Sequence, residues 1–359
     1  MLIQNIIYPL IISFILCVLL MPLCLIFIKK LGLFDDPKKH KHPAIIHKKP
    51  VPRGGGIPLF LSIAIASIFF LPLTKITVAL FAASFIALVV GILDDKFDLS
   101  PYFRFFMNIV CALIVVTSGV TIPFITNPIG GILDLDSLKI SFSFFQNAQV
   151  FSFSDLIALI WIVWIMNTLN WSKGVDGQMP GIVAISAIII GILSLRFPIT
   201  DIDTQIAAKL AFIIAGGSIG FLVFNFYPAK IFPGYGATAI YLLLAAVSIL
   251  SSVKLATAIL VMGVPIVDGV FTIGRRILEK KSPFVHDNKH LHHLFLKMGF
   301  TQKSIALFYW LFSAILGAIS LTLSSTGKVF AIIMLVTIVG GILLSLHLLL
   351  ERSDEKISV

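Results

Sequence analysis

The chain has 359 residues, of which 58% are hydrophobic and 12% are charged, and its mean hydropathy is +1.05. Soluble domains contain about 45–50% apolar and about 25% charged residues. A chain this apolar has too little polar surface to cover a globule in water, which excludes a soluble enzyme, a disordered tail and a secreted module. The composition predicts an all-α integral membrane protein, a single polytopic domain over residues 1–359.

Apolar runs that approach the length needed to cross a bilayer as a helix, about 20 residues, predict eleven transmembrane helices. They lie near residues 6–28, 57–73, 76–93, 103–123, 155–171, 179–195, 206–226, 237–253, 255–273, 304–323 and 329–350. An odd number of spans places the two termini on opposite sides of the membrane. Several runs are short, and the eighth and ninth are nearly continuous, so ten or twelve spans stay open.

The net charge of +10 is explained by topology rather than by a nucleic-acid partner. With the N-terminus outside and the C-terminus cytoplasmic, 21 of the 27 lysines and arginines fall in cytoplasmic segments, as the positive-inside rule requires. We therefore expect the active site in cytoplasmic loops near 30–56, 94–102, 167–180, 227–238 and 274–303. In the long outer loop near 124–153, the alternating LKISFSFF predicts a small β-hairpin.

Three aspartates close an apolar run in the segment GILDDKFDLSPYFRF (91–105). Asp94 and Asp95 are adjacent, and Asp98 follows one turn later. Carboxylates at a membrane boundary are costly unless they are solvated, paired or bound to a metal, and Mg²⁺ prefers oxygen ligands. The adjacent pair favours a catalytic or metal-binding role over helix-capping acids in a solvated loop.

Two asparagines lie on one helix face in the segment NTLNWSKGVDGQMPG (167–181). Asn167 and Asn170 are three residues apart, and an amide can both donate to and accept from sugar hydroxyl or acetamido groups. Asp176 and Gly177 then make the turn into the next span. A simple turn rich in glycine and asparagine is the competing interpretation.

A histidine cluster follows the basic segment GRRILEKK, in SPFVHDNKHLHHLFLKMGF (282–300). With no cysteine and one nearby carboxylate, His290, His292 and His293 do not predict a zinc site. Arginine and histidine donors suit a diphosphate better, and this interpretation includes Arg275 and Arg276. A basic loop at the membrane surface would account equally well for the two arginines, but poorly for the histidines.

Two further segments bring cations to the same side. In HKKPVPRGGGIP (47–58), the glycines after Arg53 can expose N–H groups as an anion-binding concavity, although a bend at a span boundary explains them as well. In NFYPAKIFPGYGAT (225–238), Lys230 is a candidate phosphate contact or an interfacial lysine that extends toward water.

Taken together and in this order, these segments resemble the polyprenyl-phosphate N-acetylhexosamine-1-phosphate transferases. The resemblance covers almost the whole chain and is carried by PVPRGGG, GILDDKFDLSPYFRF, NTLNWSKGVDG, NFYPAKIF, PIVDGVFTIGRR and SPFVHDNKHLHH. The bacterial undecaprenyl-phosphate GlcNAc-1-phosphate transferases are the most similar branch. The resemblance implies an eleven-helix membrane protein of the bacterial cytoplasmic (inner) membrane that takes part in cell-envelope glycan assembly, such as lipopolysaccharide or teichoic acid synthesis.

The resemblance also implies the reaction. A UDP-N-acetylhexosamine, with GlcNAc as the leading choice, transfers its sugar-1-phosphate to undecaprenyl phosphate and releases UMP, with Mg²⁺ or Mn²⁺ as cofactor. Asp94 and Asp95 match the pair that prepares the lipid phosphate for attack, and Arg104 stands where a basic residue follows that pair. Asp95 and Asp176 are the candidate metal ligands. Oligomeric state stays open, with a homodimer as one option.

Two positions depart from the family pattern N-x-x-N-x-x-D-G-x-D-G and from its G-D-x-G-S/T loop. Lys173 replaces the first aspartate of the former, and Tyr235 replaces the aspartate that is the expected Mg²⁺ ligand. One interpretation is compensation, in which Lys173 neutralises the diphosphate itself while Asp94, Asp95 and Asp176 hold a differently placed metal ion. The other is a catalytically silent homologue that binds polyprenyl phosphate or a nucleotide-sugar as a scaffold or regulator.

Overall fold

The computed structural model describes residues 3–38, 47, 49–127, 130–144, 147–196, 201–250, 255–284 and 287–357. Helices dominate it and the strands are short. The helices are α1 (Tyr8–Lys30), preceded by a π-helical turn at Ile3–Ile7, α2 (Gly56–Phe70), α3 (Lys75–Phe97), α4 (Pro101–Val116), α5 (Phe153–Trp171), α6 (Gln178–Ser194), α7 (Ile202–Asn225), α8 (Thr238–Leu250), α9 (Leu255–Val261), α10 (Gly263–Leu278), α11 (Leu291–Lys297), α12 (Gln302–Thr322) and α13 (Ser325–Ile357).

Every predicted apolar run overlaps one of these helices or the pair α9–α10, although the run predicted for 103–123 continues past the end of α4, and residues 251–253 lie outside the described part of the chain. Among the described residues, six helices are long and apolar enough to cross a membrane, and the pair α9–α10 makes a seventh if it is one bent span. The helices α2, α4, α6 and α8 are apolar but shorter. Large apolar side chains such as Leu19, Ile68 and Phe330 are exposed on the outside of the bundle, as lipid contact requires. The chain is a multi-pass, all-α membrane protein.

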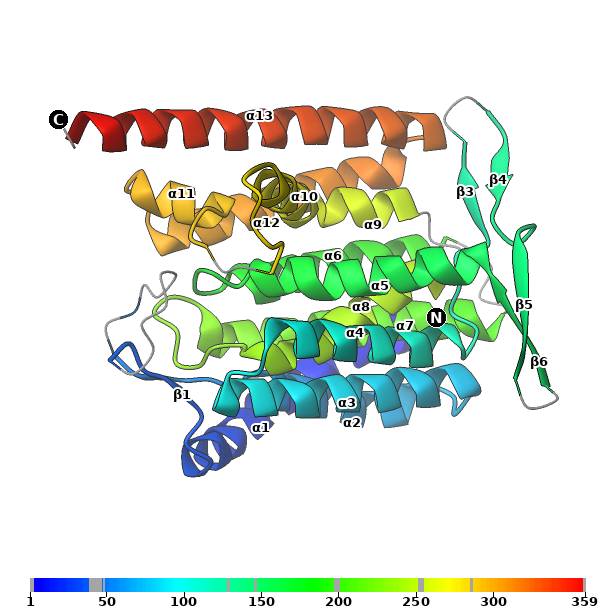
Figure 1. The fold of residues 1–359 in the computed structure, drawn as a ribbon. Coiled ribbons are helices and arrows are strands. Elements are labelled where there is room, and N and C mark those ends of the chain that lie inside the picture. Colours follow the sequence, from blue (N-terminus) through cyan, green and yellow to red (C-terminus); the bar gives the residue numbers. More distant parts are fainter. Residues whose placement is uncertain are drawn as a thin grey trace.

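The ninth predicted run is not one straight helix. The chain bends by 84° between α9 and α10, and Pro265 lies in the first turn of α10, two residues after Gly263. A proline ring collides with the carbonyl four residues earlier in a continuous helix, so a straight path through Val261 is blocked. The break turns α10 across the bundle, and Figure 1 shows it nearly end-on.

Several helix ends follow from local sequence. Thr74 caps α3 and pairs reciprocally with Thr77, and Ser152 does the same for α5 with Asp155, so backbone N–H groups that the first turn leaves unpaired find partners. The helix α8 is apolar on every face and is buried from Thr238 to Ile249, as expected of a helix at the centre of a bundle.

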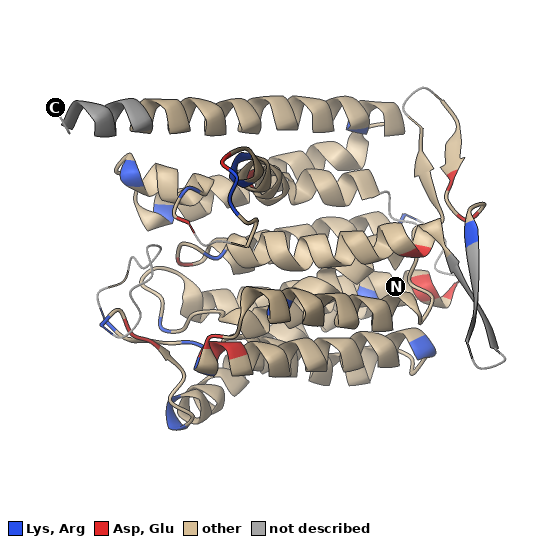
Figure 2. Cartoon of the chain, viewed as in Figure 1, with Lys and Arg blue, Asp and Glu red and all other residues tan. Residues whose placement is uncertain are grey.

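The helices lie side by side, with β-hairpins at one end of the bundle (Figure 1). The predicted hairpin is present: β5 (Lys139–Phe144) pairs antiparallel with β6 (Asn147–Ser152), and β3 (Phe124–Thr126) pairs with β4 (Ile132–Asp134). A third pair, β1 (Phe34–Asp35) with β2 (Val51–Pro52), lies at the opposite end. α1 starts at the hairpin end and α13 ends at the other, where most of the charged residues lie (Figure 2).

Candidate active site

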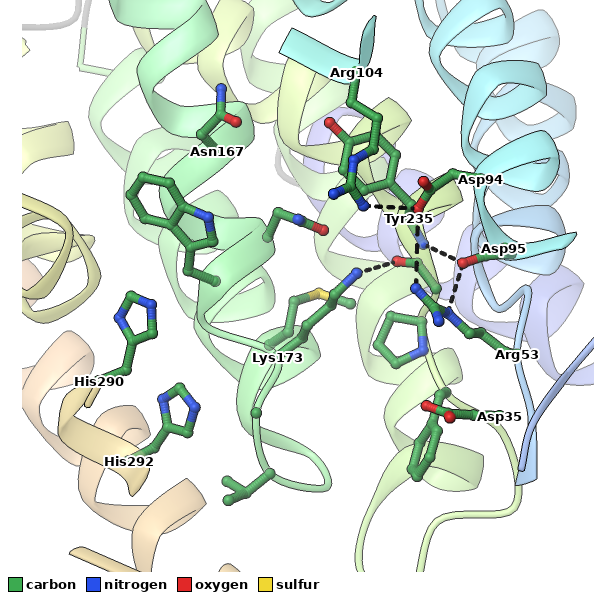
Figure 3. Close-up of a pocket in the computed structure, with 18 of the residues that line it drawn as sticks. Asp35, Arg53, Asp94, Asp95, Arg104, Asn167, Lys173, Tyr235, His290 and His292 are labelled. Atoms are coloured by element: carbon green, nitrogen blue, oxygen red, sulfur yellow. Dashed lines mark hydrogen bonds and ion pairs between the residues drawn. The ribbon is translucent and has the colours of Figure 1, made fainter. Parts of the chain in front are cut away.

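A cavity of about 430 Å³ opens among the loops at the charged end of the bundle. Its size is in the range of small-molecule sites, and Figure 3 shows side chains from well-separated segments facing it. The predicted site residues that line it are Arg53, Asp94, Asp95, Arg104, Asn167, Asn170, Lys173, Asp176, Arg276, His290, His292 and His293. Tyr235 also lines it, whereas Lys230 and Arg275 do not.

The aspartate pair at the end of α3 is held by two arginines. Arg53 Nε lies 2.7 Å from Asp95 Oδ1, and Arg104 Nη1 lies 3.1 Å from Asp94 Oδ2. The backbone N–H groups of Leu99 and Tyr235 donate to Asp94 Oδ1 and Asp95 Oδ1, at 3.1 and 2.8 Å. Both carboxylates are fully buried as side chains, and such groups are tolerated where paired and hydrogen-bonded.

Three glycines bring the segments of the site into backbone contact. A Cβ atom on Gly56 or on Gly91 would collide with the backbone of Gly236. Only glycine allows this approach, which joins the start of α2, the end of α3 and the loop before α8. Arg53, the aspartate pair and Tyr235 are therefore placed by one tight junction.

The predicted anion-binding concavity after Arg53 is not formed. The N–H groups of Gly54 and Gly55 donate to the Phe232 carbonyl, and that of Gly56 donates to Pro233 O at 2.9 Å. These donors are used to attach the segment to the loop 226–234. The N–H groups after Arg53 are therefore not available to bind an anion.

Lys173 and Tyr235, the two departures from the family pattern, meet in the structure. Lys173 Nζ donates to the carbonyl of Gly234 at 2.9 Å and lies 5.7 Å from the centre of the Tyr235 ring. The Arg104 guanidinium lies 5.1 Å from the same centre. The Tyr235 hydroxyl accepts a hydrogen bond from Asn108 at 3.1 Å. Burial and the nearby Arg53 guanidinium lower the pKa of Lys173 to about 7.

The two asparagines differ in how much of their hydrogen-bonding capacity is used. Asn167 donates to Val163 O of its own helix at 2.7 Å. Asn170 Oδ1 is buried and has no hydrogen-bond partner. A buried acceptor without a partner costs about 1–3 kcal/mol, so Asn170 is poised to accept a hydrogen bond from a ligand in the cavity.

Asp176 connects two loops of the site. Its Oδ2 accepts from the N–H of Ala229 at 2.9 Å, and its own N–H donates to Gln302 Oε1 at 3.1 Å. The next N–H, of Gly177, donates to Asn225 Oδ1 at 3.1 Å. Burial raises the pKa of Asp176, against the opposing effect of the Ala229 bond. The turn after α5 is thereby fixed against α7 and α12.

The three histidines stack in a row that begins at Trp171. The rings of Trp171 and His290 have centres 5.9 Å apart, and His290 stacks on His292 at 5.7 Å. His290 Nδ1 lies 2.9 Å from Asp268 Oδ2, which orients the ring and fixes its tautomer. Burial and the neighbouring histidines lower the pKa of His292 well below its usual value, so His292 is neutral.

The two arginines at the end of α10 share one carboxylate. Arg275 Nη2 and Arg276 Nε lie 2.7 and 2.9 Å from Asp287 Oδ2. Although burial opposes it, hydrogen bonds from Arg276 and Arg275 hold the pKa of Asp287 well below its usual range. Arg276 lines the cavity, whereas Arg275 does not. Lys230 is exposed outside the cavity, as the interfacial interpretation predicts.

The donors around Asp95 do not fit the predicted Mg²⁺. Three of the four oxygens of the aspartate pair accept from arginines or backbone N–H groups. The fourth, Asp95 Oδ2, has no partner, but a Cβ on Gly234 would collide with it, so the loop backbone covers it. No three His, Cys, Asp or Glu side chains within the described ranges come together as potential ligands. Mg²⁺ is usually held by one or two carboxylates together with water and substrate phosphates, and each oxygen of this aspartate pair is either engaged or covered.

Two functional candidates are added by the structure. Asp268 orients His290, and its Oδ1 accepts from the N–H of Leu291 at 3.0 Å. Trp171 covers the other face of the His290 ring. The sequence contains a sign of Asp268, because a charged residue within an apolar segment such as PIVDGVF is costly and so indicates a function. It contains no comparable sign of Trp171, because tryptophan is common at the ends of membrane spans.

The fold and the cavity define a multi-pass membrane protein with a polar, cation-rich site at one end of its helical bundle. Residues 77–252 match the model of glycosyl transferase family 4. A relative from Thermotoga maritima, named undecaprenyl-phosphate alpha-N-acetylglucosaminyl 1-phosphate transferase, is 30% identical over 93% of this chain and 95% of its own. The chain belongs to this family of phosphosugar transferases.

Two further relatives bear related names. A Bacillus subtilis protein named probable undecaprenyl-phosphate N-acetylglucosaminyl 1-phosphate transferase is 28% identical over 82% of this chain and 78% of its own. An Escherichia coli protein, the undecaprenyl-phosphate alpha-N-acetylglucosaminyl 1-phosphate transferase, is 26% identical over 81% and 76%. The similarity therefore extends over most of the chain and beyond the residues matched by the family model.

Proposed function

We propose that the protein transfers GlcNAc-1-phosphate from UDP-GlcNAc to undecaprenyl phosphate and releases UMP. The observation that carries this proposal is the single cavity lined by the aspartate pair, Asn170, Lys173 and the histidine row, in a chain similar over most of its length to transferases with that name. Both substrates are anionic, and the cavity combines cations with buried amide groups. Its position among loops at the end of an apolar bundle suits a water-soluble donor and a lipid acceptor.

The transfer exchanges one phosphorus–oxygen bond for another. An oxygen of the lipid phosphate attacks the β-phosphorus of the nucleotide-sugar, and the bond from that phosphorus to the bridging oxygen breaks. UMP leaves with the electron pair of that bond. With both phosphates ionised, charge is conserved and no proton is released. The task of the protein is to position the two anions and to stabilise the charge on the leaving group.

The described contacts support a division of labour among the side chains. Asp94 and Asp95 hold Arg104 and Arg53 at the cavity, which suits them to positioning the lipid phosphate between two cations. Asn170 offers an acceptor without a partner for a sugar hydroxyl or acetamido N–H. The row from Trp171 to His292 offers flat surfaces and nitrogen atoms on the opposite side of the cavity.

The orientation in the membrane belongs to the same proposal. Eleven spans, with the N-terminus outside, place the cavity at the cytoplasmic face of a bacterial inner membrane, where nucleotide-sugars are available. Support comes from the apolar helices and from the start of α1 and the end of α13 at opposite ends of the bundle. Four shorter helices and the bent pair α9–α10 would then complete the spans.

The test measures UMP release by the purified protein in detergent. The protein is supplied with undecaprenyl phosphate, a panel of UDP-sugars and 10 mM Mg²⁺. Release with UDP-GlcNAc, dependent on the lipid and lost in Asp95→Asn, is the expected result. No release with any sugar, from protein that elutes as a single folded species, would overturn the proposal. Binding of UDP-GlcNAc without release would instead establish the silent, ligand-binding homologue.

A further inference from the structure

The positions at which this chain departs from its family pattern form one local change. Lys173 and Tyr235 are 62 positions apart in sequence, yet the Lys173 ammonium lies over the Tyr235 ring and bonds to the preceding residue, Gly234. The two replacements therefore change one small region of the cavity wall, and their combined effect on its charge and hydrogen bonds can be considered together.

The joint change reverses the charge of the cavity wall. When Lys173 is protonated, as it is below its pKa of about 7 or beside a bound diphosphate, Arg53, Arg104 and Lys173 supply three cations around the two carboxylates of Asp94 and Asp95, which leaves one positive charge. With aspartates at positions 173 and 235 the same wall would carry two negative charges. A wall with two negative charges repels a diphosphate unless a divalent cation is bound, whereas a positive wall attracts one directly.

The geometry around Tyr235 closes the position that a metal ligand would occupy. The phenol is buried and its hydroxyl is engaged by Asn108, and a neutral phenol, with a usual pKa of about 10, is a poor ligand for a hard cation. The neighbouring N–H of Tyr235 and the guanidinium of Arg53 already occupy Asp95 Oδ1. The same volume instead contains an ammonium group with three N–H donors, of which one is used by Gly234.

We propose that Lys173 takes the place of a divalent metal ion in this site and binds the diphosphate of the nucleotide-sugar directly, so that transfer proceeds without metal. This inference rests on the proposed function for its chemistry. In the transfer step, the ammonium group stabilises the charge that develops on UMP as the bridging bond breaks. Arg53 and Arg104 keep the wall positive, and the aspartate pair keeps the two guanidinium groups in place.

The decisive experiment measures two quantities in metal-free buffer with 5 mM EDTA and again with 10 mM Mg²⁺. One is UMP release from UDP-GlcNAc and undecaprenyl phosphate, and the other is UDP-GlcNAc binding by calorimetry. For the wild-type protein we expect both to agree within about twofold between the two buffers. A drop of tenfold or more in EDTA that Mg²⁺ or Mn²⁺ reverses would overturn the inference.

Variants of the two positions separate the role of charge from that of folding. Lys173→Met removes the cation and is expected to weaken binding and to lower UMP release by about 10²–10³-fold in both buffers, the usual loss for a donor that stabilises developing charge. Lys173→Arg keeps the charge and should retain part of the activity. Lys297→Met, which removes an exposed lysine outside the cavity, is the matched control and should behave as the wild type.

The double variant Lys173→Asp with Tyr235→Asp tests the reverse change. Its cavity wall becomes negative, and we expect binding that is weak in EDTA and strengthened at least tenfold by Mg²⁺. A double variant as indifferent to Mg²⁺ as the wild type would contradict the charge argument. If neither the wild type nor any variant releases UMP in either buffer, the proposed function fails and calorimetry alone decides the inference. UDP-GlcNAc binding in EDTA that Lys173→Met abolishes would support the inference. UDP-GlcNAc binding that requires Mg²⁺ would overturn it.

Discussion

Two buried carboxylates and two guanidinium groups make one ionic cluster at the end of α3. Asp94→Asn removes the carboxylate that Arg104 contacts, and Asp95→Asn removes the carboxylate 2.7 Å from Arg53, which then keeps only the weaker contact with Asp94 at 4.0 Å. We expect each change to lower the rate of UMP release by at least about 100-fold, since positioning errors near 1 Å have effects of that size.

The control for this prediction is Asp203→Asn, at the hairpin end of α7, which should keep the wild-type rate. Size-exclusion profiles of all three proteins establish that they are folded. Wild-type rates in both Asp94→Asn and Asp95→Asn would remove the pair from the mechanism.

The lowered pKa of Lys173 predicts that ligand binding is coupled to proton uptake. Its charged neighbours are Arg53, Arg104, Asp94 and Asp95. At pH 8.5 the lysine of the free protein, with a pKa of about 7, is largely neutral; a diphosphate beside it favours the ammonium form and raises that pKa. Binding of UDP-GlcNAc should therefore take up close to one proton at pH 8.5 and almost none at pH 6, and affinity should fall as pH rises above 7.

Calorimetry at pH 8.5 in two buffers with different ionisation enthalpies measures this uptake. Lys173→Met should bind more weakly and without the lysine-linked proton. Equal proton uptake in the variant and the wild type would show that another group titrates.

At the level of single residues, the sequence alone identified most of the candidate side chains that line the cavity. Spacing and residue type identified the aspartate pair, Asn170 and the histidine row, because charged or amide groups at the end of an apolar run need a partner. The same reasoning could not find that Lys173 and Tyr235 touch, since that contact depends on how two loops pack. Nor could it decide between the two interpretations of the glycines after Arg53, because only the folded chain shows that their N–H groups donate to Phe232 and Pro233.

Among the structural elements, the turn between α5 and α6 carries a position that tolerates no side chain. A Cβ on Gly174 would collide with the imidazole of His292, which is itself buried. We expect Gly174→Ala to displace the histidine row and to lower UMP release by at least tenfold. Overpacking of this kind also costs about 1–3 kcal/mol, so the midpoint of thermal unfolding should fall by a few degrees.

Gly274→Ala is the matched control for that change. Gly274 lies within α10, and a Cβ there meets nothing within 4 Å. Alanine is the better helix former by about 1 kcal/mol, so this variant should be at least as stable as the wild type and equally active. Equal activity of the two variants would mean that the histidine row does not contribute to the reaction.

Helix positions were predictable because apolar length alone identifies them, and the hairpin because its residues alternate. The bend between α9 and α10 was not predicted, although Pro265 was visible, because a proline either kinks a helix or is accommodated according to its neighbours. Whether the four shorter helices cross the membrane depends on tilt and packing, which apolar length does not determine.

For the molecule as a whole, the three cysteines offer a simple test of orientation. Cys17, Cys24 and Cys111 are all free and buried, so the native chain should give little labelling by a membrane-impermeant maleimide. Ser137→Cys places a thiol at an exposed position beside the hairpins, and Met298→Cys places one at the cavity end. In intact cells we expect Ser137→Cys to be labelled and Met298→Cys to be labelled only after the membrane is permeabilised. The opposite pattern would invert the proposed topology.

The junction of Gly56, Gly91 and Gly236 has a consequence for how the cavity adapts. Where backbone touches backbone, no side chain can change its rotamer to make room. The wall that bears Arg53, the aspartate pair and Tyr235 is thus a fixed template for the phosphate groups, which stay the same whichever UDP-sugar is used. The opposite wall consists of side chains on α10, on α11 and on the segment between them, and these can be exchanged without disturbing that template. A change of sugar preference, in evolution or by design, would therefore have to be made on the histidine side.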